Sequence, residues 1–185
     1  IRLAAGMAST TAAGTTVSSG GTLGFQAGIT YSTAEAVTIN GTGASSLGAI
    51  NNVSGVNSFA GAITLASAST MESQSGTLTL SGAIANGGFL LTVGGAGNIT
   101  ASGVISGTGA LSGLTKNDAG TLVLSGANTY ENYTTINGGV LNIQNSAALG
   151  TTAGDTTINS GALELQGGIT VAVGEDLTLN GTGIS

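Results

Sequence analysis

The chain has 185 residues, of which 34 are glycine and only 5% are charged, with a net charge of −6 and no histidine, cysteine, proline or tryptophan. Nucleic-acid binding requires clustered basic side chains, and this chain has only Arg2 and Lys116, so we expect no nucleic-acid partner. No apolar run approaches the ~18 residues of a membrane-spanning helix. A zinc site or a nucleophilic triad cannot be built without histidine or cysteine, so we expect no metal and no cofactor.

Short alternating segments, separated by turns of Gly, Asn and Ser, predict β-strands along the chain. In chain order, clear examples are TLTL at Thr77–Leu80, ALEL at Ala162–Leu165 and LTL at Leu177–Leu179. Alternation with a period of two is typical of half-buried strands. We therefore expect Thr77, Thr79, Glu164 and Thr178 to face outward. The leucines predicted to face inward are Leu78, Leu80, Leu163, Leu165, Leu177 and Leu179.

A short sequence repeat, with a period of about 22 residues, keeps these strands in phase. GTLTLSG at 76–82 recurs as GTLVLSG at 120–126, TTIN at 134–137 recurs at 156–159, and GVLNIQ at 139–144 matches GALELQ at 161–166. Hairpin turns are scarce, which opposes an antiparallel sandwich. In-phase repeats instead predict an all-β parallel β-helix (β-solenoid) with about 20–22 residues per coil, continuous over residues 1–185. Stacked at about 4.8 Å, eight or nine coils make a rod on the order of 40 Å.

A second, longer repeat has a period of about 140 residues. Residues 23–45 align without a gap with residues 163–185, and 12 of the 23 positions are identical. With one extra residue allowed, the match extends to 10–45 and 151–185. Neither end has a polar capping segment, and Ile1 is not followed by a signal peptide. We therefore expect the chain to be a fragment of a longer tandem array.

Residues 120–150, GTLVLSGANTYENYTTINGGVLNIQNSAALG, carry the most specific pattern in the chain. The segment resembles the passenger-associated β-strand repeat of bacterial autotransporters, with Glu131–Asn132–Tyr133 where the family usually has Thr-Gly-Gly. The structural repeat positions are Gly120, Leu122, Leu124, Gly126, Asn128, Tyr130, Thr135, Ile136, Gly139, Leu141, Leu149 and Gly150. The resemblance implies a right-handed β-helix, secreted by a type V-like route and held at the Gram-negative outer membrane by a separate translocator domain.

We expect a structural, adhesin-type passenger stalk on the bacterial cell surface, without catalysis. The alternative is a segment of an extracellular filament whose coils stack end to end between chains. The partners expected are neighbouring repeats or further copies of the chain, together with host-cell, matrix or cell-surface targets. An ice-binding solenoid would need flat threonine arrays, and the outward threonines do not recur regularly enough to predict one.

A polysaccharide-cleaving enzyme is the last alternative, and it would need two carboxylates ~5–10 Å apart. Glu175 and Asp176 are adjacent, so on a strand they point to opposite sides. The alternative pair is Glu164 and Glu175, converging across coils, but we expect these carboxylates to be scattered on outward positions.

Several other residues have a structural interpretation that we favour. Lys116–Asn117–Asp118 is predicted to form a polar turn. Asn98, within GGAGNITAS, lacks the aspartates of a calcium-binding repeat and is also placed in a turn. Asparagines at strand ends are expected to form stacked amide ladders. Tyr130 is predicted to pack at a coil corner, whereas Tyr31 and Tyr133 are candidates for surface recognition.

Overall fold

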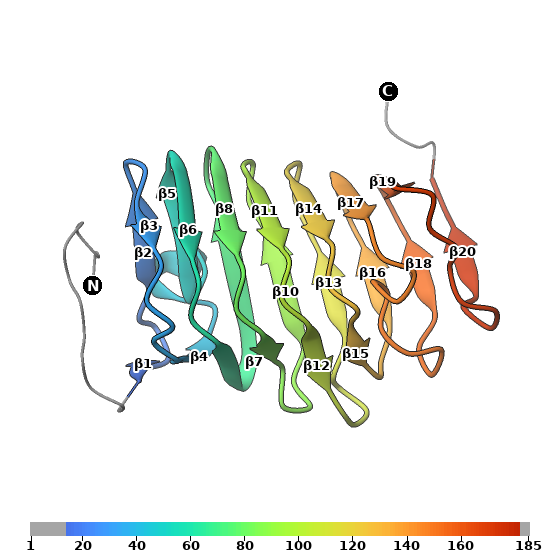
Figure 1. Ribbon diagram of the computed structural model, residues 1–185, viewed down its shortest axis with the longest axis horizontal. Helices are drawn as coiled ribbons and strands as arrows, with labels where there is room; N and C mark the ends of the chain where they lie inside the picture. Colours follow the sequence, from blue (N-terminus) through green and yellow to red (C-terminus); the bar gives the residue numbers. More distant parts are fainter. Residues whose placement is uncertain (1–13, 182–185) are drawn as a thin grey trace.

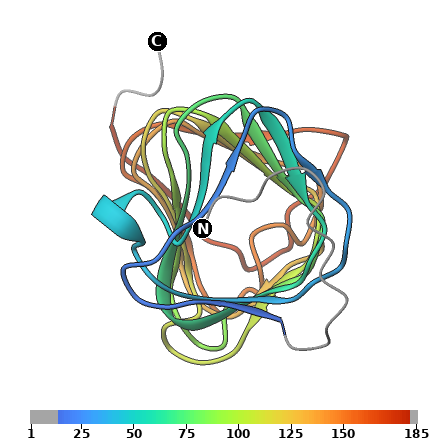
Figure 2. The same ribbon diagram turned by 90° about the vertical axis from the view of Figure 1, so that its left-hand side faces the viewer.

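The chain winds into a β-solenoid of stacked coils. We describe it from a computed structural model, in which residues 14–181 are placed. Figure 1 shows the strands succeeding one another along the long axis in chain order. Figure 2, along that axis, shows the coils superposed around a common interior. Every strand pair is parallel, as the in-phase repeats predict. The parallel β-solenoid is thus confirmed, while its right-handedness stays a prediction.

Three ladders of strands form the walls. The first face contains β2 (Leu23–Gln26), β5 (Ile50–Ser54), the second half of β7 (Ile63–Ser73), β10 (Leu91–Gly94), β13 (Leu114–Lys116), β16 (Thr134–Ile136), β18 (Thr156–Ile158) and β20 (Leu177–Leu179). The second face contains β3 (Thr30–Tyr31), β6 (Val56–Phe59), β8 (Thr77–Leu80), β11 (Asn98–Ala101), β14 (Thr121–Leu124), β17 (Val140–Ile143) and β19 (Ala162–Leu165). The third face contains β1 (Thr15–Val17), β4 (Val37–Gly41), the first half of β7, β9 (Ile84–Ala85), β12 (Ile105–Gly107) and β15 (Thr129–Tyr130). From β2 to β17 the chain visits the three faces in the same order, and after β15 it has strands on the first and second faces only.

The short sequence repeat corresponds to one coil. Leu78 of β8 is in register with Ile99 of β11, which is in register with Leu122 of β14, so the two GTL-LSG copies lie two coils apart on the second face. The first described coil is longer, because Leu23 pairs with Ile50 and the connection between β4 and β5 contains the 3-10 turn η1 (Ala44–Ser46). Figure 2 shows η1 projecting outside the wall.

The core is a set of apolar columns that run along the axis. Leu78 and Leu80 are fully buried, as predicted, and the corresponding side chains of β11, β14 and β17 continue both columns. Each fully buried leucine or isoleucine contributes roughly 1.5–3 kcal/mol, so the stability of each coil depends on its neighbours. Phe59 packs against the rings of Phe25 and Tyr31 near the amino-terminal end of the described region, with centroids 5.8 and 5.6 Å apart.

The leucines of the last strands, which are predicted to face inward, are not buried. Leu165 is 52% exposed, Leu177 43% and Leu179 75%, and Leu163 is only partly buried. Their register with buried residues of the preceding coil is nevertheless maintained, since Leu165 pairs with Ile143 and Leu179 with Ile158. Alternation correctly gives the direction of these side chains. Burial also requires a coil on the other side, and within residues 14–181 β19 and β20 are the outer strands of their ladders.

Candidate functional site

The predicted repeat positions lie in the coil that begins at Gly120 and in the first part of the next coil, which begins at Gly139, and most of them are structural. The inward side chains among them are fully buried, namely Leu122, Leu124, Tyr130, Ile136 and Leu141, and Leu149 is buried as well. Tyr130 lies at a coil corner, where its hydroxyl and that of Thr134 are 2.7 Å apart, so its predicted packing is confirmed. Burial also raises the pKa of Tyr130, which keeps the phenol neutral. Thr135 is the one repeat position that faces outward on a strand.

Two columns of glycine allow the coils to approach closely at the corners. One follows the second face and contains Gly61, Gly82, Gly103 and Gly126. A Cβ added at Gly82 would lie 2.1 Å from the carbonyl oxygen of Gly61, and one at Gly103 would lie 2.0 Å from that of Gly82. The other column precedes the second face and contains Gly55, Gly76, Gly97, Gly120, Gly139 and Gly161. At these positions a side chain would force neighbouring coils apart.

Asn128 ties three coils together through its side chain. The buried amide accepts a hydrogen bond at Oδ1 from the backbone N–H of Ile105 in the preceding coil (2.8 Å). Its Nδ2 donates to the carbonyl of Ala148 in the following coil (2.6 Å). Asn57 makes a comparable contact nearer the amino-terminal end, accepting from the N–H of Ile29 at 2.6 Å. These asparagines satisfy backbone groups at a corner where the strand ladder is interrupted.

A column of threonines runs along the outside of the first face. Thr70, Thr92, Thr115, Thr135, Thr157 and Thr178 lie in register on six successive coils. The prediction that outward threonines recur irregularly is therefore wrong for this face. The column is one residue wide. Beside it, Asn117, Asn137 and Asn159 form an amide ladder with two bonds of 2.9 Å, which confirms the predicted asparagine stacking. The surface is therefore not the broad threonine array that an ice-binding interpretation needs.

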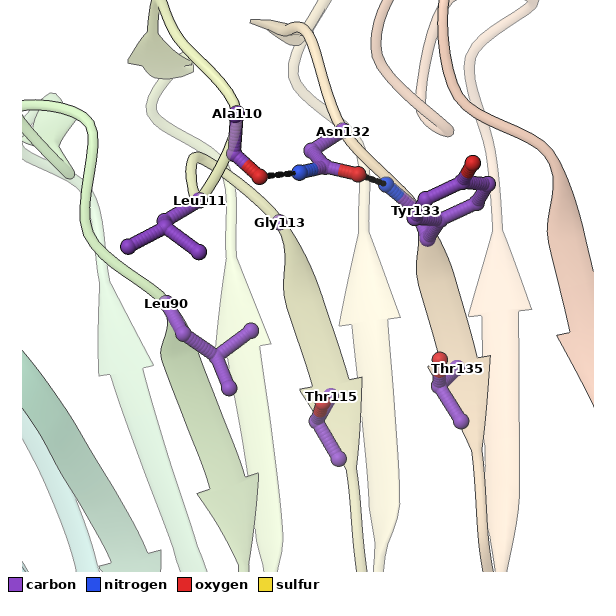
Figure 3. Close-up of a pocket in the computed structure, with 8 residues that line it drawn as sticks. All are labelled: Leu90, Ala110, Leu111, Gly113, Thr115, Asn132, Tyr133 and Thr135. Carbon is purple, nitrogen blue, oxygen red and sulfur yellow. Dashed lines mark hydrogen bonds between the residues drawn. The ribbon is translucent and has the colours of Figure 1, made fainter.

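A shallow hollow of about 230 Å³ interrupts this regular surface on the other side of the threonine column. Leu90, Gly113 and Tyr133 immediately precede the neighbouring strands β10, β13 and β16, with Gly113 in the middle. Because glycine has no side chain, a gap opens over Thr115 and Thr135. Figure 3 shows Leu90, Leu111 and Tyr133 around the gap. The Tyr133 side chain is 58% exposed, and Leu111 and Leu90 are exposed as well. This is the most distinctive surface feature of the coil.

The residues around the hollow hold a connecting loop in place. Asn132 donates from Nδ2 to the carbonyl of Ala110 and accepts at Oδ1 from the N–H of Tyr133 (Figure 3). Glu131 accepts at Oε2 from the N–H of Gly109 at 3.0 Å. Both contacts reach the connection between β12 and β13, residues 108–113, and fasten it to the next coil.

Comparisons with known proteins agree with this geometry. A family model described as passenger-associated-transport-repeat matches residues 114–143, which extend from β13 through β17. Residues 114–143 are a passenger-associated transport repeat. Over 70 residues the chain is also 43% identical to the adhesin BmaC autotransporter of Brucella suis biovar 1 (strain 1330), a match that covers 38% of this chain. The chain spans 2% of the length of that relative. No solved structure matches the chain.

The passenger repeat implies a secreted or surface-exposed location, and repeats of this kind are typically not catalytic. Glu131–Asn132–Tyr133 stands where the resemblance predicts Thr-Gly-Gly. Glu131 and Asn132 fasten the β12–β13 connection, and Asn132 and Tyr133 line the hollow. The deviation in sequence and the irregularity in shape therefore coincide.

Lys116 lies inside the matched repeat and not in the turn predicted for it. It ends β13, is 2% exposed, and its Nζ donates to the carbonyls of Asn117 (2.5 Å), Asp118 (2.9 Å) and Gly138 (3.2 Å). Burial lowers the pKa of Lys116 to about 8, an effect that the carboxylate of Asp118 partly offsets. Through these hydrogen bonds the buried lysine holds the turn that precedes β14 in place.

This lysine gives stability an unusual pH dependence. Its pKa is lower in the folded chain than in the unfolded chain, so between pH 8 and 10 the unfolded state binds more protons and stability rises with pH. We expect the free energy of unfolding to increase by about 1–3 kcal/mol over this range. The chain has one lysine and no histidine or cysteine, so few other groups titrate there. Urea denaturation at pH 7.5 and 9.5 measures the rise, and Lys116→Met should abolish it. An equal rise in the variant would contradict the assignment.

The other candidate residues lie in different parts of the fold and do not form one site. Tyr31 is buried and donates from its hydroxyl to Glu35 Oε2 at 2.5 Å, so its predicted role in surface recognition is wrong. Asn98 begins β11 instead of lying in a turn, and its Oδ1 accepts from the N–H of Thr121. Glu175 and Asp176 lie in a connection and not on a strand.

Glu164 and Glu175 lie near different faces of the solenoid. Glu164 lies on β19 of the second face and accepts from Asn142 Nδ2 (3.1 Å). Glu175 precedes β20 of the first face, where it accepts from the hydroxyl of Thr156 (2.6 Å) and where burial raises its pKa. Among residues 14–181, no group of three or more acidic, histidine or cysteine side chains is arranged to hold a metal ion. The same residues contain no helix long and apolar enough to cross a membrane.

Proposed function

We propose that this chain is a non-catalytic stalk segment in the passenger of a large secreted protein, displayed on the Gram-negative outer membrane by a type V-like route. The observation that carries the proposal is the uninterrupted register of parallel strands through the matched repeat. A translocator domain outside these residues would anchor it. The long sequence repeat supports a role as one unit of a tandem array.

The architecture suits a protein that crosses a membrane unfolded and folds outside. Each coil forms hydrogen bonds almost entirely with its two neighbours, so a coil that has emerged can add to the one before it. With no cysteine in the chain, disulfides cannot trap it during export. The outward-facing polar columns of Thr and Asn and the low charge give a long surface with little like-charge repulsion between neighbouring stalks.

A display experiment tests this proposal. The chain is fused between a signal peptide and an autotransporter translocator in a Gram-negative host, and surface protein is measured with an antibody tag and external protease. We expect display of a protease-resistant segment at levels close to those of a natural passenger. A Gly103→Ala variant, which disturbs coil stacking, should be displayed less or be degraded. Equal display of both proteins, or retention of the parent chain in the periplasm, would contradict the stalk proposal.

A self-assembling filament is the second candidate, and the exposed Leu165, Leu177 and Leu179 favour it. In this alternative the coils of separate chains stack end to end. Sedimentation velocity over a hundredfold concentration range separates the two proposals, because a stalk segment stays at constant mass whereas a filament subunit grows with concentration. Contact with host-cell or matrix targets would use the hollow beside Tyr133, where the surface departs from the repeat.

A further inference from the structure

Strands that are one long repeat apart in the sequence do not lie on the same face of the solenoid. Residues that recur one coil apart stay on the same face, as Thr134 and Thr156 do. At the offset of the long repeat the strands change face. β2 lies on the first face, whereas its counterpart β19 lies on the second; β4 lies on the third, whereas its counterpart β20 lies on the first. Both counterparts have advanced by one face in the winding direction.

The strand register explains this advance. From Leu165 the register can be followed back, one coil at a time, through Ile143, Leu124, Ala101, Leu80 and Phe59 to Tyr31 on the second face. The sequence counterpart of Leu165 is not Tyr31 but Phe25, which lies on the preceding face of the same coil. The long repeat therefore exceeds six coils by the stretch of chain from one face to the next.

Because the long repeat exceeds six whole coils, successive units are related by a screw operation, a translation along the axis combined with a rotation. Each unit of the long repeat is turned onto the next face relative to the unit before it. Because the solenoid has three faces, three units restore the original orientation.

The two copies differ in what covers them. Phe25, Val37 and Ile39 are fully buried, because β5 covers β2 and β7 covers β4. Their counterparts in the second copy are exposed along β19 and β20 at the right-hand end of Figure 1, namely Leu165, Leu177 and Leu179. Equivalent apolar side chains at equivalent strand positions thus differ only in whether a next coil lies over them.

We propose that the open edge of β19 and β20 is a docking surface for one specific coil, a segment with the sequence of residues 46–73 joined in cis. In the first copy this segment follows Ser45, the counterpart of Ser185, and supplies β5, β6 and β7. On the open edge its β5 sequence would pair with β19 on the second face, and the first half of its β7 sequence would pair with β20 on the first.

The pairing register follows from the first copy. Gly24 lies opposite Asn51, so Glu164 should lie opposite the Asn51 of the added segment, and Leu177 should lie opposite its Ile63. A separate whole chain cannot supply this coil, because its own residues 46–73 already lie between neighbouring strands on both sides. In a tandem array, the hollow beside Tyr133 would then face three directions in turn.

The test is a chain of residues 1–185 followed directly by residues 46–73. The matched control carries an added segment of the same composition in which the apolar and polar positions of the strands are exchanged. Hydrogen–deuterium exchange should show at least roughly tenfold greater protection of β19 and β20 in the first protein than in the control. Equal protection in the two proteins would overturn the proposal.

Cysteine pairs test the register, because the parent chain has no cysteine. Glu164→Cys combined with Asn51→Cys in the added segment should form a disulfide, since adjacent strands place the Cα atoms within bonding range. Gln166→Cys with the same partner is two residues out of register and should remain reduced. A disulfide in the second pair and not in the first would overturn the one-face advance. Both readouts concern folding alone, so their failure is independent of whether the stalk is displayed.

Discussion

Replacing Gly103 with alanine should destabilise the solenoid by about 3 kcal/mol or more. The added Cβ would lie 2.0 Å from the carbonyl oxygen of Gly82, and this oxygen belongs to the backbone, which cannot rotate away. Overpacking of a well-packed interior typically costs about 1–3 kcal/mol, and here relief would require two coils to separate at a corner. The expected result is a lower denaturation midpoint in guanidinium chloride and early exchange of the amides of β9 and β12.

Gly24→Ala is the matched control for this substitution. Gly24 lies on β2, and its added Cβ would meet Val53 Cγ2 at 3.7 Å, an ordinary contact distance. Neither glycine has the left-handed backbone conformation, so conformational strain does not distinguish the two positions. We expect a change within about 1 kcal/mol for Gly24→Ala, because alanine also reduces the entropy of the unfolded chain. Similar losses at both positions would show that close coil approach is not the cause.

The strand pattern and coil length were predictable from the sequence because both depend on local alternation and on repetition. Leu122 and Leu124 alternate with polar residues, and the copies of GTL-LSG fall on one face as their spacing predicts. The exposure of Leu165 and Leu179 was not predictable, because burial depends on the coil next to them and not on their own strand.

The buried environment of Lys116 was not predictable either, because it also depends on a neighbouring coil. Its sequence context is polar, and only the folded coil brings the carbonyl of Gly138, 22 residues away, within reach of its Nζ. Tyr31 was misjudged in the same way, because Phe59, which stacks on it, belongs to the next coil. The hollow could have been suspected from the Glu131–Asn132–Tyr133 deviation, but its position also depends on Gly113 in the preceding coil.

Asn128→Ala should be the most damaging substitution of a polar side chain in the matched repeat. It removes the acceptor for the N–H of Ile105 and the donor for the carbonyl of Ala148, both in buried surroundings. An unsatisfied buried group costs about 1–3 kcal/mol, so we expect a loss of roughly 3 kcal/mol in the free energy of unfolding. Urea denaturation measures the loss.

Asn137→Ala is the control, because Asn137 belongs to the exposed amide ladder and its loss leaves groups that water can satisfy. It should cost less than about 1 kcal/mol. Asn128→Asp separates bonding from packing, since it keeps an acceptor for Ile105 and replaces the donor to Ala148 with an oxygen. When ionised, this carboxylate would be buried opposite a carbonyl oxygen, so its pKa should rise on folding and the variant should become more stable as pH falls. If the three variants were equally stable at every pH, the side chain of Asn128 would only fill space, and the corners would depend on the glycine columns alone.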